Sequence, residues 1–179
     1  MERFVTHFSL PTSHFSLQRG FTLIELVLYM GLMTILIGAL STIFTTIVDV
    51  QTESKSTSSV DQDGRYILAK LLYDFQGNTP VVINTPSSLG TPSTSLVLTL
   101  SGTSTTYSVN GSNNLILTNS YGSNQVNSSD TSVATFSATR IGNGSTTDTV
   151  EVNFTVTSRT KQRSGYESKS FTSTFAGHN

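Results

Sequence analysis

One carboxylate stands inside the most apolar stretch of the chain, and it is the first group that could do chemistry. Glu25 is the only charged residue between Phe21 and Val48. An ionised side chain in an apolar helix costs about 2.5–3.5 kcal/mol at the centre of a bilayer and less near its ends. Because a charged partner can offset that cost, we expect Glu25 to form an ion pair with a positive group.

Other reactive groups are scarce in this sequence. The chain has no cysteine, which excludes disulfides, thiolate metal sites and a cysteine nucleophile. The three histidines, His7, His14 and His178, precede the apolar stretch or stand next to the last residue. The residues needed for a Ser-His-Asp triad or a histidine zinc site are therefore almost entirely lacking. We predict no catalytic residue, no metal, no cofactor and no enzymatic activity.

Two polar clusters are weaker candidates for a binding site. Arg159, Lys161 and Arg163 alternate along the chain, so in a strand they would share one face. Such a face could contact DNA or another anionic polymer, although a solvated hairpin end is the simpler interpretation. The net charge of -1 gives no general case for nucleic-acid binding. Asp61-Gln62-Asp63-Gly64 resembles the start of a calcium loop without its remaining ligands, so capping or solvation explains it better.

The apolar stretch from Phe21 to Val48 is long enough to cross a membrane. Its 28 residues would span about 42 Å as a helix, against about 30 Å for a bilayer core. Helix is required there, because lipid cannot satisfy open backbone groups. Arg3 and Arg19 precede the stretch, which predicts a cytoplasmic N-terminus.

The helix is expected to continue with one buried face. Three apolar residues recur at helical spacing, Ile67, Leu71 and Phe75, with Leu68 and Leu72 beside them. Asp63, Lys70 and Asp74 interleave as polar positions. Ser54–Ser59 and Gly64 are weak helix formers, which permits a local break near 54–64. Gly77–Pro80 ends the helix.

Residues beyond Pro80 alternate between apolar and polar, the pattern of half-buried strands. The apolar positions are Leu96, Leu98 and Leu100; Tyr107 and Val109; Leu115 and Leu117; Ala134, Phe136 and Ala138; Val150, Val152, Phe154 and Val156; and Phe171 and Phe175. Turns are predicted at Asn110–Asn113, at Gly142–Gly144 and at Ser164–Gly165. The predicted fold class is α+β, a long N-terminal helix whose amphipathic half covers an antiparallel sheet.

The segment Arg19-Gly20-Phe21-Thr22-Leu23-Ile24-Glu25-Leu26 resembles the type IV pilin and type II secretion pseudopilin superfamily. Members share a short polar leader ending in glycine, then Phe-Thr-Leu-Ile-Glu, then an apolar helix. Beyond Val48 the resemblance is architectural. Residues Arg65 to Asp74 are similar to the corresponding helix of minor pilins and J-type pseudopilins. The lack of cysteine departs from many Gram-negative major pilins, whose C-terminal loop is disulfide-bonded.

The resemblance implies a division of the chain and a processing site. The regions would be a leader peptide (1–20), a transmembrane helix (21–50), its amphipathic continuation (51–76) and a β-rich globular head (77–179). A prepilin peptidase would cut the Gly20–Phe21 bond and methylate the new amine of Phe21. Glu25 would pair with that amine on a neighbouring subunit and fix the axial register of a filament.

On this resemblance the chain is a structural subunit, a minor pilin or pseudopilin, of a type IV pilus or a type II secretion-like filament. Its partners would be the prepilin peptidase, other pilin or pseudopilin subunits, a platform protein, an assembly ATPase acting indirectly, and membrane lipid. It would wait in the cytoplasmic membrane with its head outside, and then join an extracellular or periplasmic filament. Two alternatives stay open: a competence pilus subunit whose head contacts DNA, and an unprocessed signal-anchored surface protein.

Overall fold

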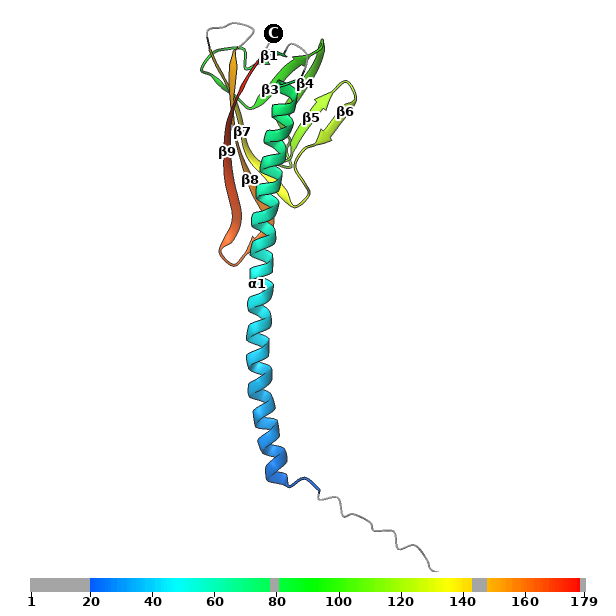
Figure 1. The fold of residues 1–179 in the computed structure, drawn as a ribbon, viewed down its shortest axis with the longest axis vertical. Coiled ribbons are helices and arrows are strands. Elements are labelled where there is room, and N and C mark those ends of the chain that lie inside the picture. The colour runs from blue at the N-terminus through cyan, green and yellow to red at the C-terminus, as the bar shows by residue number, and fades with distance from the viewer. Residues whose placement is uncertain (1–19, 78–80, 143–147, 178–179) are drawn as a thin grey trace, which may run out of the picture. The chain divides into compact units, whose positions relative to one another are not determined.

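A computed structural model describes residues 20–77, 81–142 and 148–177 of the chain. These residues form one helix and two antiparallel sheets, which confirms the α+β fold class (Figure 1). The chain divides into two compact units, Met1–Phe44 and Thr45–Asn179. The second unit holds both sheets and the part of the helix that packs on them.

Helix α1 runs without interruption from Leu23 to Phe75, so the break considered near 54–64 does not occur. Tertiary packing overrides the weak helix propensity of this region. Ser56 and Val60 are buried under the head. At Gly64 the ring of Phe171 lies where a side chain would begin, and a Cβ there would stand 2.0 Å from Cζ of that ring. Glycine is needed at this position because it lets the ring approach the helix backbone.

The predicted apolar stripe of the helix is confirmed. Ile67, Leu71 and Phe75 are at most 2% exposed and belong to the core of the head. Leu68 packs against the same core from the side, whereas Leu72 is exposed. One face of α1 is therefore a structural part of the head.

The first sheet has the order β1-β3-β4-β5-β6. Its strands are β1 (Val81–Thr85), β3 (Ser95–Leu100), β4 (Thr103–Val109), β5 (Leu115–Asn119) and β6 (Gly122–Gln125). The predicted core residues of β3, β4 and β5 point inward, with Leu96, Leu98, Tyr107 and Leu115 fully buried. The predicted turn at Asn110–Asn113 joins β4 to β5, and the Asn110 side chain accepts hydrogen bonds from the amides of Ser112 and Asn114.

The second sheet has the order β2-β7-β8-β9. Its strands are β2 (Pro92–Ser93), β7 (Thr131–Ile141), β8 (Thr149–Gln162) and β9 (Gly165–Ala176). The predicted alternation along β8 is confirmed, because Val150, Val152, Phe154 and Val156 are at most 1% exposed. The turn predicted at Ser164–Gly165 joins β8 to β9. The turn predicted at Gly142–Gly144 lies largely outside the described residues.

The prediction for Ala134 is wrong. The pairing of β7 with β8 shifts register between Val133 and Thr135, which is the signature of a bulge. The extra residue turns Ala134 to solvent and places Val133 in the core beside Phe136. A two-residue period cannot foresee such a shift.

Two aromatic pairs join the last strand to the helix and to strand β8. Phe75 stacks on Phe175 with 5.2 Å between ring centroids, and Phe154 of β8 stacks on Phe171 of β9 at 5.4 Å. Phe171 and Phe175 thus both face the core, as their spacing predicts. The stack of Phe75 on Phe175 fixes the end of α1 against the second sheet.

Candidate functional site

The Gly20–Phe21 bond lies just outside the start of helix α1. Thr22 is the N-cap: its hydroxyl accepts a hydrogen bond from the amide of Glu25 at 3.3 Å, and its carbonyl accepts one from the amide of Leu26 at 3.1 Å. Gly20 is exposed, and the side chain of Phe21 is 76% exposed. A peptide bond before the cap is free of helical hydrogen bonds, so a peptidase can bind this segment without unwinding the helix.

Glu25 lies in the first turn of α1, where the helix dipole favours a negative charge. Its side chain is partly exposed. Among the described residues no cation lies within ion-pair distance of its carboxylate. Any positive partner of Glu25 would therefore come from outside this set of residues.

The apolar part of α1 has no cover in the chain itself. None of the 18 residues in its most apolar window is buried, and the helix is long and apolar enough to cross a membrane. Large side chains along it are about half to four-fifths exposed, such as Leu23, Leu28 and Ile35. An apolar surface of this extent requires lipid or another protein around it.

Residues 15–41 match the model of the prokaryotic N-terminal methylation motif. The chain carries the type IV pilin and pseudopilin signature. The match covers the Gly20–Phe21 junction, Glu25 and most of the exposed apolar helix. It indicates a prepilin-type processed protein of structural character, and it agrees with anchoring in a membrane. No curated protein and no solved structure matches the chain.

The three cations of the predicted basic cluster do not form one common face. Arg159 donates hydrogen bonds to the carbonyls of Thr131 (2.9 Å) and Ser112 (3.0 Å) and to the side chain of Asn114 (2.7 Å). Its guanidinium therefore links β7 to the loop between β4 and β5. Arg163 lies 3.7 Å from the carboxylate of Asp49, and Lys161, two residues before it near the end of β8, is exposed.

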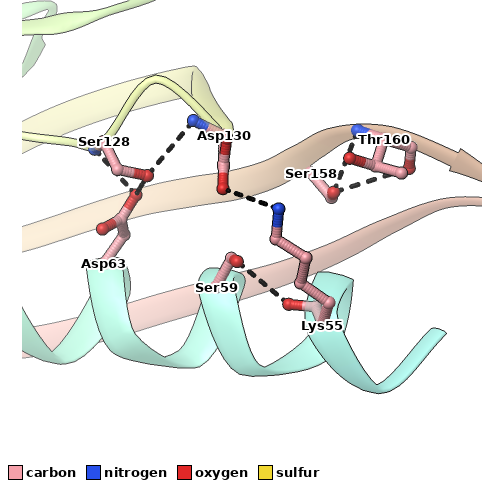
Figure 2. A network of polar contacts seen from close by, with 7 residues as sticks. All are labelled: Lys55, Ser59, Asp63, Ser128, Asp130, Ser158 and Thr160. Carbon is pink, nitrogen blue, oxygen red and sulfur yellow. Dashed lines mark hydrogen bonds and ion pairs between the residues drawn. The ribbon is translucent and has the colours of Figure 1, made fainter. Parts of the chain in front are cut away.

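Two helix carboxylates, Asp63 and Asp74, are buried, although the sequence pattern predicts them as polar positions of the helix. Asp63 accepts hydrogen bonds through Oδ2 from the Ser128 amide (2.8 Å), the Ser128 hydroxyl (2.7 Å) and the Thr131 hydroxyl. Figure 2 shows Asp63 directed at the loop that carries Ser128, while Lys55 bridges to Asp130 from one side. The interpretation of Asp63 as a cap or a solvated residue is wrong, because the carboxylate closes the loop between β6 and β7.

Asp74 is the second of these carboxylates. It accepts hydrogen bonds from the hydroxyl of Tyr107 and from Lys70 Nζ, the latter at 2.6 Å. A signal for Asp63 was present in the spacing, because it stands four residues before Ile67 and thus on the buried stripe. Both carboxylates are buried and accept hydrogen bonds between the helix and the head, so their role is structural. Among the described residues, no cluster of three or more His, Cys, Asp or Glu side chains is suited to a metal.

Proposed function

We propose that the chain is a structural subunit, a minor pilin or pseudopilin, of a type IV pilus or a type II secretion-like filament. A prepilin peptidase removes residues 1–20, and the new N-terminus at Phe21 is methylated. The subunit is stored in the cytoplasmic membrane through α1, with its head outside. A platform protein, driven indirectly by an assembly ATPase, then moves it into the filament among other pilin or pseudopilin subunits.

The observation that carries this proposal is the position of the Gly20–Phe21 bond. It immediately precedes the N-cap of an exposed apolar helix, within the matched methylation motif. Cleavage there would leave a positive amine four residues before Glu25. The same cleavage would place the amine just before the N-cap of the helix and leave Glu25 in its first turn.

In the proposed filament, Glu25 would fix the axial position of the subunit relative to its neighbours. Its carboxylate has no cationic partner among the described residues, and the amine of Phe21 on an adjacent subunit would supply one. In an apolar filament interior each such pair would offset the desolvation of two charges. Since a slipped subunit would leave both charges unpaired, the pairing would specify register.

The intact mass of the protein extracted from membranes tests this function. We expect a chain that begins at Phe21 and carries a methyl group. A chain that begins at Met1 would support the unprocessed, signal-anchored surface protein instead. Replacement of Gly20 by a bulky residue is expected to leave the uncleaved precursor in the membrane, because the junction then no longer fits a tight active site.

The competence-pilus alternative receives less support from the geometry. Arg159, one of the three cations expected to contact DNA, is held by two backbone carbonyls and Asn114. Lys161 and Arg163 remain available, but Asp49 and Glu53 line the same groove and would repel a polyanion. We therefore assign the head no contact with DNA.

A further inference from the structure

The turn between β8 and β9 lies against the helix just beyond its apolar part. Lys161, Arg163 and Ser164 line a groove with the helix residues Asp49 and Glu53. These five residues all belong to the compact unit Thr45–Asn179. The hairpin turn, here named the basic tip and comprising residues 161–164, therefore has a defined height along α1.

That height corresponds to the surface of a bilayer. A hydrocarbon core of about 30 Å takes up about 20 helical residues, so a core that begins after Glu25 ends near Thr45. Asp49 then lies about 6 Å further along the axis, within the headgroup layer. The exposed apolar side chains of Ile47, Val48 and Val50 also favour an interfacial position for this turn of the helix.

The two cations of the basic tip, Lys161 and Arg163, form only weak ion pairs or none with the other described residues. The Arg163 side chain is 90% exposed, and its contact with the half-exposed Asp49 is long, at 3.7 Å. An exposed pair of this kind contributes little to stability. Lys161 forms no ion pair among the described residues. By contrast, Lys169 lies 2.6 Å from Asp61, and Lys55 lies 3.4 Å from Asp130.

We propose that the basic tip binds the phosphates of anionic phospholipids through Lys161 and Arg163 while the subunit is stored in the membrane. The proposal rests on the membrane-spanning role of α1 within the proposed function, and it is independent of cleavage after Gly20. Asp49 and Glu53 line the same groove, but lipid headgroups surround a tip at this height, whereas a polyanion in solution has to approach it against both carboxylates. Lipid is therefore the favoured source of the phosphate.

The contact would hold the head against the membrane in the stored state. Each cation near an anionic lipid surface favours contact by about fivefold, and salt weakens the attraction over a distance of about 10 Å. Leaving the membrane for a filament would release this contact. The basic tip would thus orient the head relative to the membrane surface, which the apolar helix alone does not do.

A single reporter on the tip tests the proposal. Because the chain has no cysteine, Ser164→Cys provides one labelling site on the full-length protein. The labelled chain is reconstituted in vesicles of phosphatidylcholine, with or without equimolar phosphatidylglycerol, and quenching by a headgroup-attached quencher is measured. We expect stronger quenching with phosphatidylglycerol than without it, and this increase should disappear in high salt. In Lys161→Gln and in Arg163→Gln, the equilibrium constant for contact of the tip with the membrane, obtained from the quenching, should decrease about fivefold for each cation removed.

Matched controls separate this contact from general charge effects. A label at Tyr121→Cys, on the turn between β5 and β6, should not respond to phosphatidylglycerol. The pair Lys55→Gln and Lys169→Gln removes the same charge as the tip variants and should keep the response. Equal quenching in both kinds of vesicle, an equal loss in the control pair, or failure of the chain to insert would each overturn the proposal. So would quenching that responds to added duplex DNA and not to phosphatidylglycerol, since the tip would then bind DNA.

Discussion

The hydroxyl of Tyr107 in β4 donates a hydrogen bond to the carboxylate of Asp74 in the last turn of α1. Tyr107 is fully buried, and Lys70 binds the other oxygen of Asp74 at 2.6 Å. Burial raises the pKa of Tyr107 well above its usual range, and the hydrogen bond to the Asp74 carboxylate and its charge add to the effect. The end of the helix is thereby connected to the interior of the first sheet.

Removing this link should weaken the head. Tyr107→Phe leaves one oxygen of the buried Asp74 without its donor, which costs about 1–3 kcal/mol in the free energy of unfolding. Tyr121→Phe is the control, because that side chain is 94% exposed. Urea denaturation of the detergent-solubilised chain measures both. An equal effect of the two substitutions would show that the buried link contributes nothing.

The same tyrosine predicts a loss of stability at high pH. The folded head keeps the phenolic proton at pH values where the unfolded chain, with a pKa of about 10, releases it. Stability from this source is therefore complete below about pH 10 and decreases as the pH rises above that value. Thermal unfolding measured near pH 9 and pH 11 should show a larger decrease in Tm for the wild type than for Tyr107→Phe. Parallel decreases would assign the effect to other groups.

Gly64→Ala should destabilise the head although alanine is the better helix former. The new Cβ would meet the Phe171 ring, so the ring must move out of its stack with Phe154. Overpacking of this kind costs about 1–3 kcal/mol, against about 1 kcal/mol gained in helix propensity. Combining Gly64→Ala with Phe171→Leu should remove most of the penalty in urea denaturation. Additive effects of the two changes would contradict the contact.

Asp63→Ala tests the loop closure between β6 and β7. The substitution leaves the Ser128 amide and the hydroxyls of Ser128 and Thr131 without their acceptor. We expect a loss of about 2–4 kcal/mol in the free energy of unfolding. Asp61→Ala, two residues away, removes an exposed pair with Lys169 and should cost less than about 1 kcal/mol. If the order of the two effects is reversed, Asp63 does not hold the loop.

Glu25→Ala should separate processing from assembly. The variant is expected to insert and to be cleaved after Gly20, because removing the carboxylate lowers the cost of burial. It should be at least about tenfold depleted from sheared filaments, since a neighbour's amine would remain buried without a partner. Glu53→Ala, outside the apolar stretch, is the matched control. Wild-type amounts of processed Glu25→Ala in filaments would exclude the inter-subunit role.

The sequence predicts the elements of this fold better than its polar contacts. The stripe of Ile67, Leu71 and Phe75 and the alternation from Val150 to Val156 depend on local periods, and both are confirmed. The bulge at Ala134 depends on how β7 pairs with β8, which no local period contains. The helix through Gly64 depends on Phe171, more than a hundred residues away.

The candidate site shows the same division. Gly20, Phe21 and Glu25 follow from a contiguous motif, and their roles in cleavage, methylation and assembly stay predictions. The burial of Asp63 and Asp74 requires partners from loops and strands far along the chain. Arg159 is exposed like Lys161 and Arg163, but the local period does not contain the loop between β4 and β5, which accepts its hydrogen bonds.

The stack of Phe75 on Phe175 sets the order in which the head can be completed during synthesis. The two stacked residues stand near opposite ends of the head's sequence. Strand β9, which carries Phe175, is the last of the described strands to leave the ribosome. Until β9 is synthesised, the ring faces of Phe75 and Phe154 on which Phe175 and Phe171 stack stay uncovered. Contacts of such long separation form late. If the head lies outside the membrane as proposed, its translocation must finish before the head reaches its final stability. The chain that has not yet paired β9 would then be the form most exposed to proteases.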